Sequence, residues 1–175
     1  LEDLLNGLLL YSGNDNAVAI ADHIAGSTEK FAEMMNAEAK KLMATNSHFV
    51  NPSGLHDDNH YTTAYDLYLI FNECIKHDEF VKIINSSSYT AHITGADGTK
   101  RDVKWEPTNY YAKGEATPPD NVTIIGGKTG TTKGAGNCLI LLTKDSSGNP
   151  YISIIMGAGS KPLLYQDMTS MLSKI

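Results

Sequence analysis

The chain has 175 residues, of which 41% are hydrophobic and 19% are charged, and its net charge is −6. This length fits one domain, and the composition is that of an ordinary globular protein. An acidic chain without a Lys/Arg-rich stripe argues against nucleic acid as a partner, and the absence of an 18-residue apolar run argues against a membrane-spanning helix.

The first part of the chain is predicted to be helical. Leucines at helical spacing predict a helix over 2–10, and an alanine-rich run predicts a second helix over 15–25 that packs closely at the centre of the fold. Ser27 is expected to cap a third helix. Within that helix, Met34 and Met35 are interpreted as core filler rather than as part of a metal or cofactor site.

A polar loop is predicted over 46–61, before a capping-box-like helix start at Thr63 and a helix that runs to about Lys76. His56 and His60 would have a zinc-like spacing only if this segment were helical. Its Pro, Gly, Asp and Asn residues favour a solvated loop, so neither a metal nor a cofactor is expected.

The hydrophobic period changes from helical to alternating after residue 80. Two extended runs, 89–93 and 99–105, flank Asp97-Gly98, which is a strong hairpin signal. Three more strands are predicted after this hairpin, at 121–129, 136–143 and 150–158. A closing helix is expected from Pro162 to Ile175. Helices, then an antiparallel meander, then a helix predict an α+β fold with helices packed on an antiparallel sheet.

The two cysteines, Cys74 and Cys138, are too few for a disulfide framework and lack a Cys-x-x-Cys spacing. Cys74 lies in a helical pattern and Cys138 in an apolar strand. Both are therefore predicted to be buried free thiols.

One strand end carries groups suited to a peptide substrate. Lys128, Thr129, Gly130 and Thr131 follow the apolar run 122–125. Strand alternation places Lys128 and Gly130 on one face, and Thr129 and Thr131 on the other. Gly130 leaves room for another backbone to lie alongside, while Lys and Thr suit a substrate carboxylate. The triplet Lys128-Thr129-Gly130 alone is weak evidence for a binding site. The alternative is a strand that simply ends in a turn.

Two further segments accompany this strand end. Ser12-Gly13-Asn14 lies between two predicted helices, and 51–66 forms a long loop and the following helix start. Together with Lys128-Thr129-Gly130 they resemble the penicillin-binding-protein and serine β-lactamase superfamily. More narrowly, the chain resembles low-molecular-weight D-alanyl-D-alanine carboxypeptidases, because Ser-Gly-Asn stands where class A β-lactamases have Ser-Asp-Asn.

The resemblance implies acyl transfer through a serine ester, with peptidoglycan stem peptides and β-lactams as ligands and the bacterial cell envelope as location. Ser12 would relay protons to the leaving D-alanine, and Asn14 would hold the substrate amide. Lys128 would supply positive potential for the terminal carboxylate. Thr129 and Thr131 would lie beside that carboxylate, with the N–H group of Thr131 as half of an oxyanion hole.

The nucleophile of this family is the serine of a Ser-x-x-Lys motif that precedes Ser-Gly-Asn by several dozen residues. Only eleven residues precede Ser12, and none of them is Ser or Lys. Ser27-Thr-Glu-Lys30 fits the pattern, but it follows Ser12 and is fully explained as a helix cap. We therefore expect residues 1–175 to be a truncated catalytic domain that cannot hydrolyse a D-Ala-D-Ala peptide alone.

Three other expectations remain open. The chain could be a non-catalytic module that binds peptidoglycan or a protein partner with the same fold, or, less favoured, a β-lactamase relative. Truncation would also leave a sheet edge exposed, and exposed edges favour pairing with another chain. A homo-oligomer is therefore a possible consequence.

Overall fold

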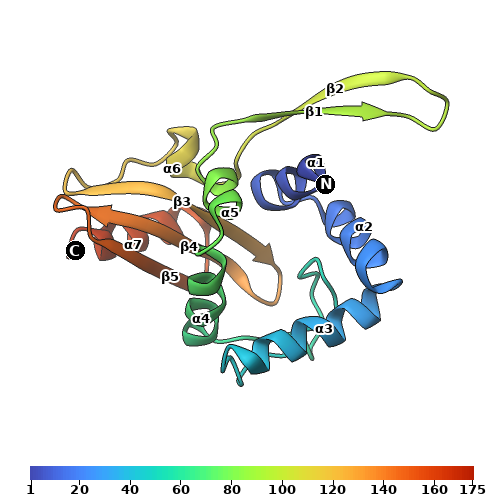
Figure 1. Ribbon diagram of the computed structural model, residues 1–175. Coiled ribbons are helices and arrows are strands. Elements are labelled where there is room, and N and C mark those ends of the chain that lie inside the picture. The colour runs from blue at the N-terminus through green and yellow to red at the C-terminus, as the bar shows by residue number, and fades with distance from the viewer.

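A computed structural model describes all 175 residues. The first part of the chain is helical, and in Figure 1 α1 to α3 form an arc beside the rest of the molecule. The helices of this part are α1 (Glu2–Asn6), the π-helix η1 (Gly7–Tyr11), α2 (Asn14–Ala25), α3 (Thr28–Lys41), α4 (Ala64–Cys74) and α5 (Asp78–Ile84). None of the helices of the molecule combines the length and apolarity needed to cross a bilayer.

The second part contains two separate antiparallel sheets rather than the single meander that the sequence predicted. A two-stranded hairpin projects from the body of the molecule (Figure 1), and a three-stranded sheet in the order β3-β4-β5 forms the centre. The elements are β1 (Tyr89–Thr94), β2 (Lys100–Trp105), α6 (Tyr110–Lys113), β3 (Val122–Thr132), β4 (Gly136–Asp145), β5 (Pro150–Ala158) and α7 (Lys161–Leu172).

The central sheet is covered on both faces. Leu139 and Leu141 of β4 pack with α7 residues such as Met168, whereas Ile140 and Leu142 pack with Phe71 of α4 and with α5. This alternation follows from the two-residue period of a strand. The closing helix therefore lies over the sheet as predicted, and the α+β class is confirmed.

Capping side chains fix the helix starts where the sequence placed them. The Ser27 hydroxyl accepts from the Lys30 N–H group at 3.2 Å, and the Thr63 hydroxyl accepts from the Asp66 N–H group at 3.1 Å. Both hydroxyls satisfy a backbone donor that the first helical turn would otherwise leave unpaired. The predicted caps are thus confirmed.

Hydrogen bonds hold the loop over 46–61 in place. The fully buried Asp66 carboxylate accepts from the Asn46 N–H group and the Ser47 hydroxyl, each at 2.7 Å. His48 Nδ1 lies 2.6 Å from the Asn59 carbonyl, and His60 Nδ1 accepts from a backbone N–H group. Burial lowers the pKa of His60, which favours this neutral acceptor form.

Helix α2 is not central, contrary to the prediction. Ala17 and Ala21 are buried, but Val18 and Ile24 are exposed. A stripe of alanines permits close contact with α1 and α3 but is too narrow to cover the larger side chains beside it. Met34 of α3 also lies exposed and is not core filler, whereas Met35 is half-buried.

The prediction that both cysteine thiols are fully buried was wrong as well. Cys74 and Cys138 are free and only half-buried. Cys74 occupies the last turn of α4, where burial raises its pKa. Cys138 lies near the end of the β3-β4 hairpin, opposite Gly130, where no bulky neighbour covers it.

Candidate active site

Ser12 sits at a sharp change of chain direction. Ser12 directly follows the last residue of the π-helix η1, its φ of 67° and ψ of 40° are left-handed, and α2 begins two residues later. A left-handed non-glycine residue costs about 1 kcal/mol or more, and short π-helical segments recur at functional sites. Gly13 beside it is buried, and a Cβ atom there would lie 2.2 Å from the Asn16 side-chain oxygen, so a larger residue would require the Asn16 side chain to move.

Lys128 reaches Ser12 across 116 residues of sequence. Its ammonium donates to Ser12 Oγ at 2.6 Å and to the carbonyl oxygen of Thr129 at 2.9 Å. No carboxylate lies within ion-pair distance of it, and burial lowers the pKa of Lys128 to about 8. This lysine can therefore be charged or neutral near physiological pH, depending on what occupies the site.

The buried ammonium predicts a pH-dependent stability. Below pH 8 the folded chain keeps Lys128 charged at a cost of about 1 to 3 kcal/mol, allowing for solvent screening of a half-buried group. Between pH 8 and about 10.5 the folded state releases this proton before the unfolded state does, so stability rises with pH in this window. Lys128→Met should therefore exceed the wild type in free energy of unfolding at pH 7.

Denaturant unfolding of both proteins at pH 7 and pH 10 checks this result. The advantage of Lys128→Met should shrink at pH 10, while contributions from other titrating groups cancel in the difference between the two proteins. If the difference in free energy of unfolding between the two proteins were the same at pH 7 and pH 10, burial of the Lys128 charge would not be its cause.

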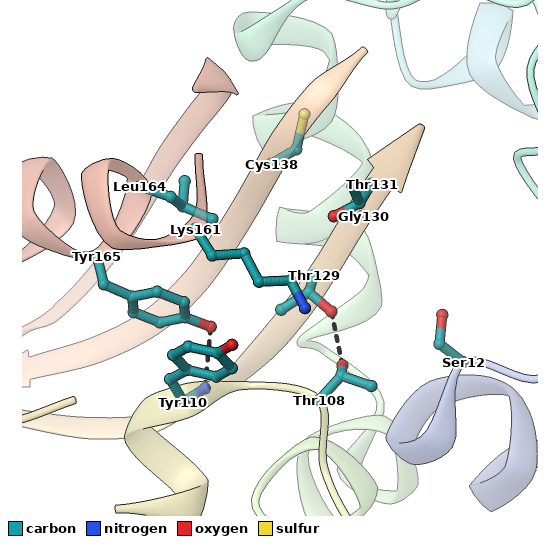
Figure 2. A pocket seen from close by; sticks show the side chains of 10 residues that line it. All are labelled: Ser12, Thr108, Tyr110, Thr129, Gly130, Thr131, Cys138, Lys161, Leu164 and Tyr165. Carbon is teal, nitrogen blue, oxygen red and sulfur yellow. Dashed lines mark hydrogen bonds between the residues drawn. The ribbon is translucent and has the colours of Figure 1, made fainter. Parts of the chain in front are cut away.

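Ser12 borders a groove of about 210 Å3 between the helical part and the sheet (Figure 2). The groove walls come from the connection between η1 and α2, the segment that leads into α6 and its first residue, strands β3 and β4, and α7. Its lining residues are Ser12, Thr108, Tyr110, Thr129, Gly130, Thr131, Cys138, Lys161, Leu164 and Tyr165. The floor of hydroxyl groups and the aromatic wall provide polar and apolar contacts for a small ligand.

The substrate-binding residues predicted on β3 all line this groove. Thr129 Oγ1 lies 2.6 Å from Thr108 Oγ1, and Thr131 donates to the Asn137 side chain at 3.3 Å. Lys128 is not in the lining but touches Ser12, which is. Asn14 lies exposed in the first turn of α2 and does not line the groove.

The glycines of β3 serve two purposes. Strand β3 pairs only with β4, so its other edge is unpaired, and a Cβ atom at Gly130 would meet nothing within 4 Å. A Cβ atom at Gly126 would instead lie 2.2 Å from the carbonyl oxygen of Ile84 in α5. Gly130 therefore leaves space beside a strand edge that is itself unpaired and that an extended peptide could join, whereas the space at Gly126 is filled by the protein's own backbone.

Sequence reasoning missed the wall opposite β3. Tyr110 and Tyr165 stack with ring centroids 4.6 Å apart, and Lys161 extends across the groove from the start of α7 (Figure 2). The Lys161 ammonium lies 5.6 Å from the Tyr110 ring centroid and has no carboxylate partner. The one sequence signal was a cation directly after the Ser160 cap, which by itself marks only a helix start.

A family model described as D-alanyl-D-alanine carboxypeptidase, Peptidase S11, matches residues 1–160. The chain belongs to this family. D-alanyl-D-alanine carboxypeptidase DacF of Bacillus subtilis (strain 168) is 30% identical over 98% of the chain, and DacD of Escherichia coli (strain K12) is 35% identical over 91%. The chain spans only 41% and 38% of the lengths of these two carboxypeptidases.

Solved structures extend the family assignment to the fold. The crystal structure of the Streptomyces K15 DD-transpeptidase superimposes with a TM-score of 0.88 at 30% identity. The match covers 98% of this chain and 66% of that transpeptidase. The carboxypeptidase-family chain thus has a partial penicillin-binding-protein fold, as its sequence predicted.

Proposed function

We propose that this chain supplies the substrate-binding and proton-transfer part of a serine-type D-alanyl-D-alanine carboxypeptidase. The observation that carries the proposal is the 2.6 Å contact between Lys128 Nζ and Ser12 Oγ, beside a groove with an open strand edge. The carboxypeptidase relatives support the substrate, a peptidoglycan stem peptide ending in D-Ala-D-Ala. They also support a site of action in the bacterial cell envelope.

The substrate would lie along the free edge of β3, where Gly130 leaves space. Its terminal carboxylate would meet the hydroxyls of Thr129 and Thr131 and the positive potential of Lys128 and Lys161. Hydrogen-bond donors placed in advance around this carboxylate would orient the scissile bond. The Thr131 N–H group would stabilise the oxyanion as the peptide carbonyl is attacked.

Ser12 would pass a proton to the leaving amine. Its hydroxyl accepts from Lys128, so its own O–H group is free to point into the groove. As the amide nitrogen of the substrate departs it must gain a proton, and Ser12 could donate one while Lys128 replaces it. The acyl group would remain as an ester on a serine until water removes it.

That serine would come from outside these 175 residues. The one Ser-x-x-Lys sequence here is Ser27-Thr-Glu-Lys30, and Ser27 caps α3 without lining the groove. The chain by itself would bind substrate but form no acyl-enzyme. We also propose that the free edge of β5, which pairs only with β4, lets two copies associate, and light scattering would detect the dimer.

A fluorescent penicillin tests this proposal, because it labels only a serine that can be acylated. The chain alone should remain unlabelled, whereas a version with a Ser-x-x-Lys segment ahead of Leu1 should be labelled at that serine and release D-alanine from a D-Ala-D-Ala peptide. Labelling of Ser27 in the chain alone would contradict the proposal. Binding of the peptide without any turnover in the extended version would favour the alternative, a non-catalytic module that binds peptidoglycan.

A further inference from the structure

Three aromatic rings stack at the base of the β1-β2 hairpin. Tyr11 of η1 lies on Trp105 of β2 with ring centroids 6.3 Å apart, and Trp105 lies on Tyr89 of β1 at 6.1 Å. Tyr89 and Trp105 are also partners across the two strands. These three residues form what we call the aromatic stack. None of them lines the groove that borders Ser12, so contact with a ligand there does not explain the stack.

The aromatic stack contacts the helical segment before Ser12 at two points. The Tyr89 hydroxyl donates to the Asp3 carboxylate of α1 at 2.8 Å, and Tyr11 is the last residue of η1. The hydrogen bond to Asp3 raises the pKa of Tyr89 to about 12, so this phenol keeps its proton at neutral pH. The hairpin, which lies beside α1 in Figure 1, therefore holds the segment both near its start and at its end.

Stacking, rather than burial, fixes the ring of Tyr11. Tyr11 is 55% exposed, whereas Trp105 is 9% exposed and belongs to a core cluster with Leu10 and Ile83. An aromatic pair contributes about 0.5 to 1.5 kcal/mol beyond the burial of its area. Trp105 is thus anchored in the core and offers one face to Tyr11, so the position of Tyr11 depends on the hairpin.

Tyr11 directly precedes Ser12, whose backbone conformation requires support. The N–H groups of Ser12 and Gly13 both donate to the Gly7 carbonyl oxygen, the second at 2.9 Å. Left-handed residues persist only where the surrounding structure over-determines them. Because π-helical hydrogen bonds span one residue more than α-helical ones, relaxation of η1 to an α-helix would rotate Ser12 about the helix axis and away from Lys128.

We infer that Trp105 is a positioning residue, which acts through Tyr11 to hold η1 in its π-helical form and Ser12 against Lys128. The inference rests on the proposed function, in which Ser12 passes a proton to the leaving amine, and adds to it an element outside the groove. A misplacement of about 1 Å can cost about 100-fold in rate. The effect should fall on kcat, whereas KM should hardly change because the lining of the groove stays intact.

Hydrogen exchange in the chain as it stands tests the positioning without any catalysis. Tyr11→Ala removes the outer ring at an exposed position, and Trp105→Leu removes the ring beneath it. Both should speed exchange of the Ser12 and Gly13 amides about tenfold and leave the amide of Leu141 in the central sheet unchanged. Trp105 is the only tryptophan of the chain, so its fluorescence should shift to the red in Tyr11→Ala, where water replaces the ring.

Peptide turnover tests the role in the reaction, in a version of the chain with a Ser-x-x-Lys segment ahead of Leu1. Tyr11→Ala and Trp105→Leu should each lower kcat for a D-Ala-D-Ala peptide about 10- to 100-fold and change KM less than about twofold. Tyr11→Phe keeps the ring and should restore kcat to within about threefold of the wild type. Val103→Ala, half-buried on the same face of β2 but outside the aromatic stack, is the matched control and should change neither kcat nor the exchange rates.

Unchanged exchange at Ser12 and Gly13 in Tyr11→Ala, or a rise in KM at constant kcat, would overturn the inference and leave the proposed function standing. If the extended wild type released no D-alanine, the proposed function would fail, and hydrogen exchange would still decide whether the aromatic stack positions Ser12. Faster exchange at Leu141 in Trp105→Leu would show that this variant loses its fold. Tyr11→Ala, whose ring is more than half exposed, would then decide the inference.

Discussion

Lys128→Ala should lower kcat/KM for a D-Ala-D-Ala peptide by about 100- to 10,000-fold, in a version of the chain that carries a Ser-x-x-Lys segment ahead of Leu1. The 2.6 Å contact makes Lys128 the immediate neighbour of Ser12, and on the proposed function its removal would take away both the proton source and the positive potential. Release of D-alanine measures the effect. Lys144→Ala, at an exposed position outside the groove, should leave the rate unchanged.

Ser12 and Lys128 should act as one unit in the same assay. If the proton passes through both groups, Ser12→Ala and Lys128→Ala combined should cost little more than the worse single substitution. Additive losses would mean that Lys128 serves only to attract the carboxylate. A double-mutant cycle on kcat/KM therefore separates the two roles of the lysine.

The pH dependence of kcat/KM gives a third test of the contact between Lys128 and Ser12. The profile of kcat/KM reports groups of the free enzyme, and burial lowers the pKa of Lys128 to about 8. Because the charged lysine donates to Ser12, kcat/KM should fall as pH rises through about 8. Lys128→Arg should move this fall to higher pH, since a guanidinium stays charged. A rise in kcat/KM through pH 8 would instead assign Lys128 as a base.

Local signals in the sequence were enough to place most elements. The caps at Ser27 and Thr63 and the Asp97-Gly98 hairpin turn depend on neighbouring residues only, so the sequence predicted them directly. Helix α5 was missed because its seven residues, Asp78–Ile84, are too few for a clear period. The split into two sheets depends on which strands meet in space, which no local pattern records.

In the candidate site, too, some residues could be predicted from local sequence motifs and others depend on packing in space. The resemblance singled out Ser12 and Lys128, and the structure brings these two together. Thr108, Tyr110 and Lys161 belong to no motif, since their role comes from the packing of α7 and the α6 connection against β3. The exposure of α2 could not be predicted either. A stripe of alanines indicates that a helix packs closely, but it does not indicate how many neighbouring elements the helix has.

The second large effect is expected from a substitution in helix α7, on the stability of the fold. Leu164→Ala should lower the free energy of unfolding by about 2 to 5 kcal/mol, whereas Leu163→Ala should change it by less than about 0.5 kcal/mol. Leu164 is 2% exposed within the main core cluster, and Leu163 is 49% exposed. Urea unfolding followed by circular dichroism measures both variants.

The comparison is informative because the two leucines are neighbours in the first turn of one helix. Substitution by alanine changes helix propensity equally at both positions, so the difference between the variants isolates packing. Leu164 contacts the same cluster as Leu139 and Leu141 of β4, and its loss opens a cavity under the groove wall. Equal effects of the two variants would mean that α7 does not hold the sheet in solution. The groove between α7 and β3 would then have no fixed wall, and peptide binding should fail together with stability.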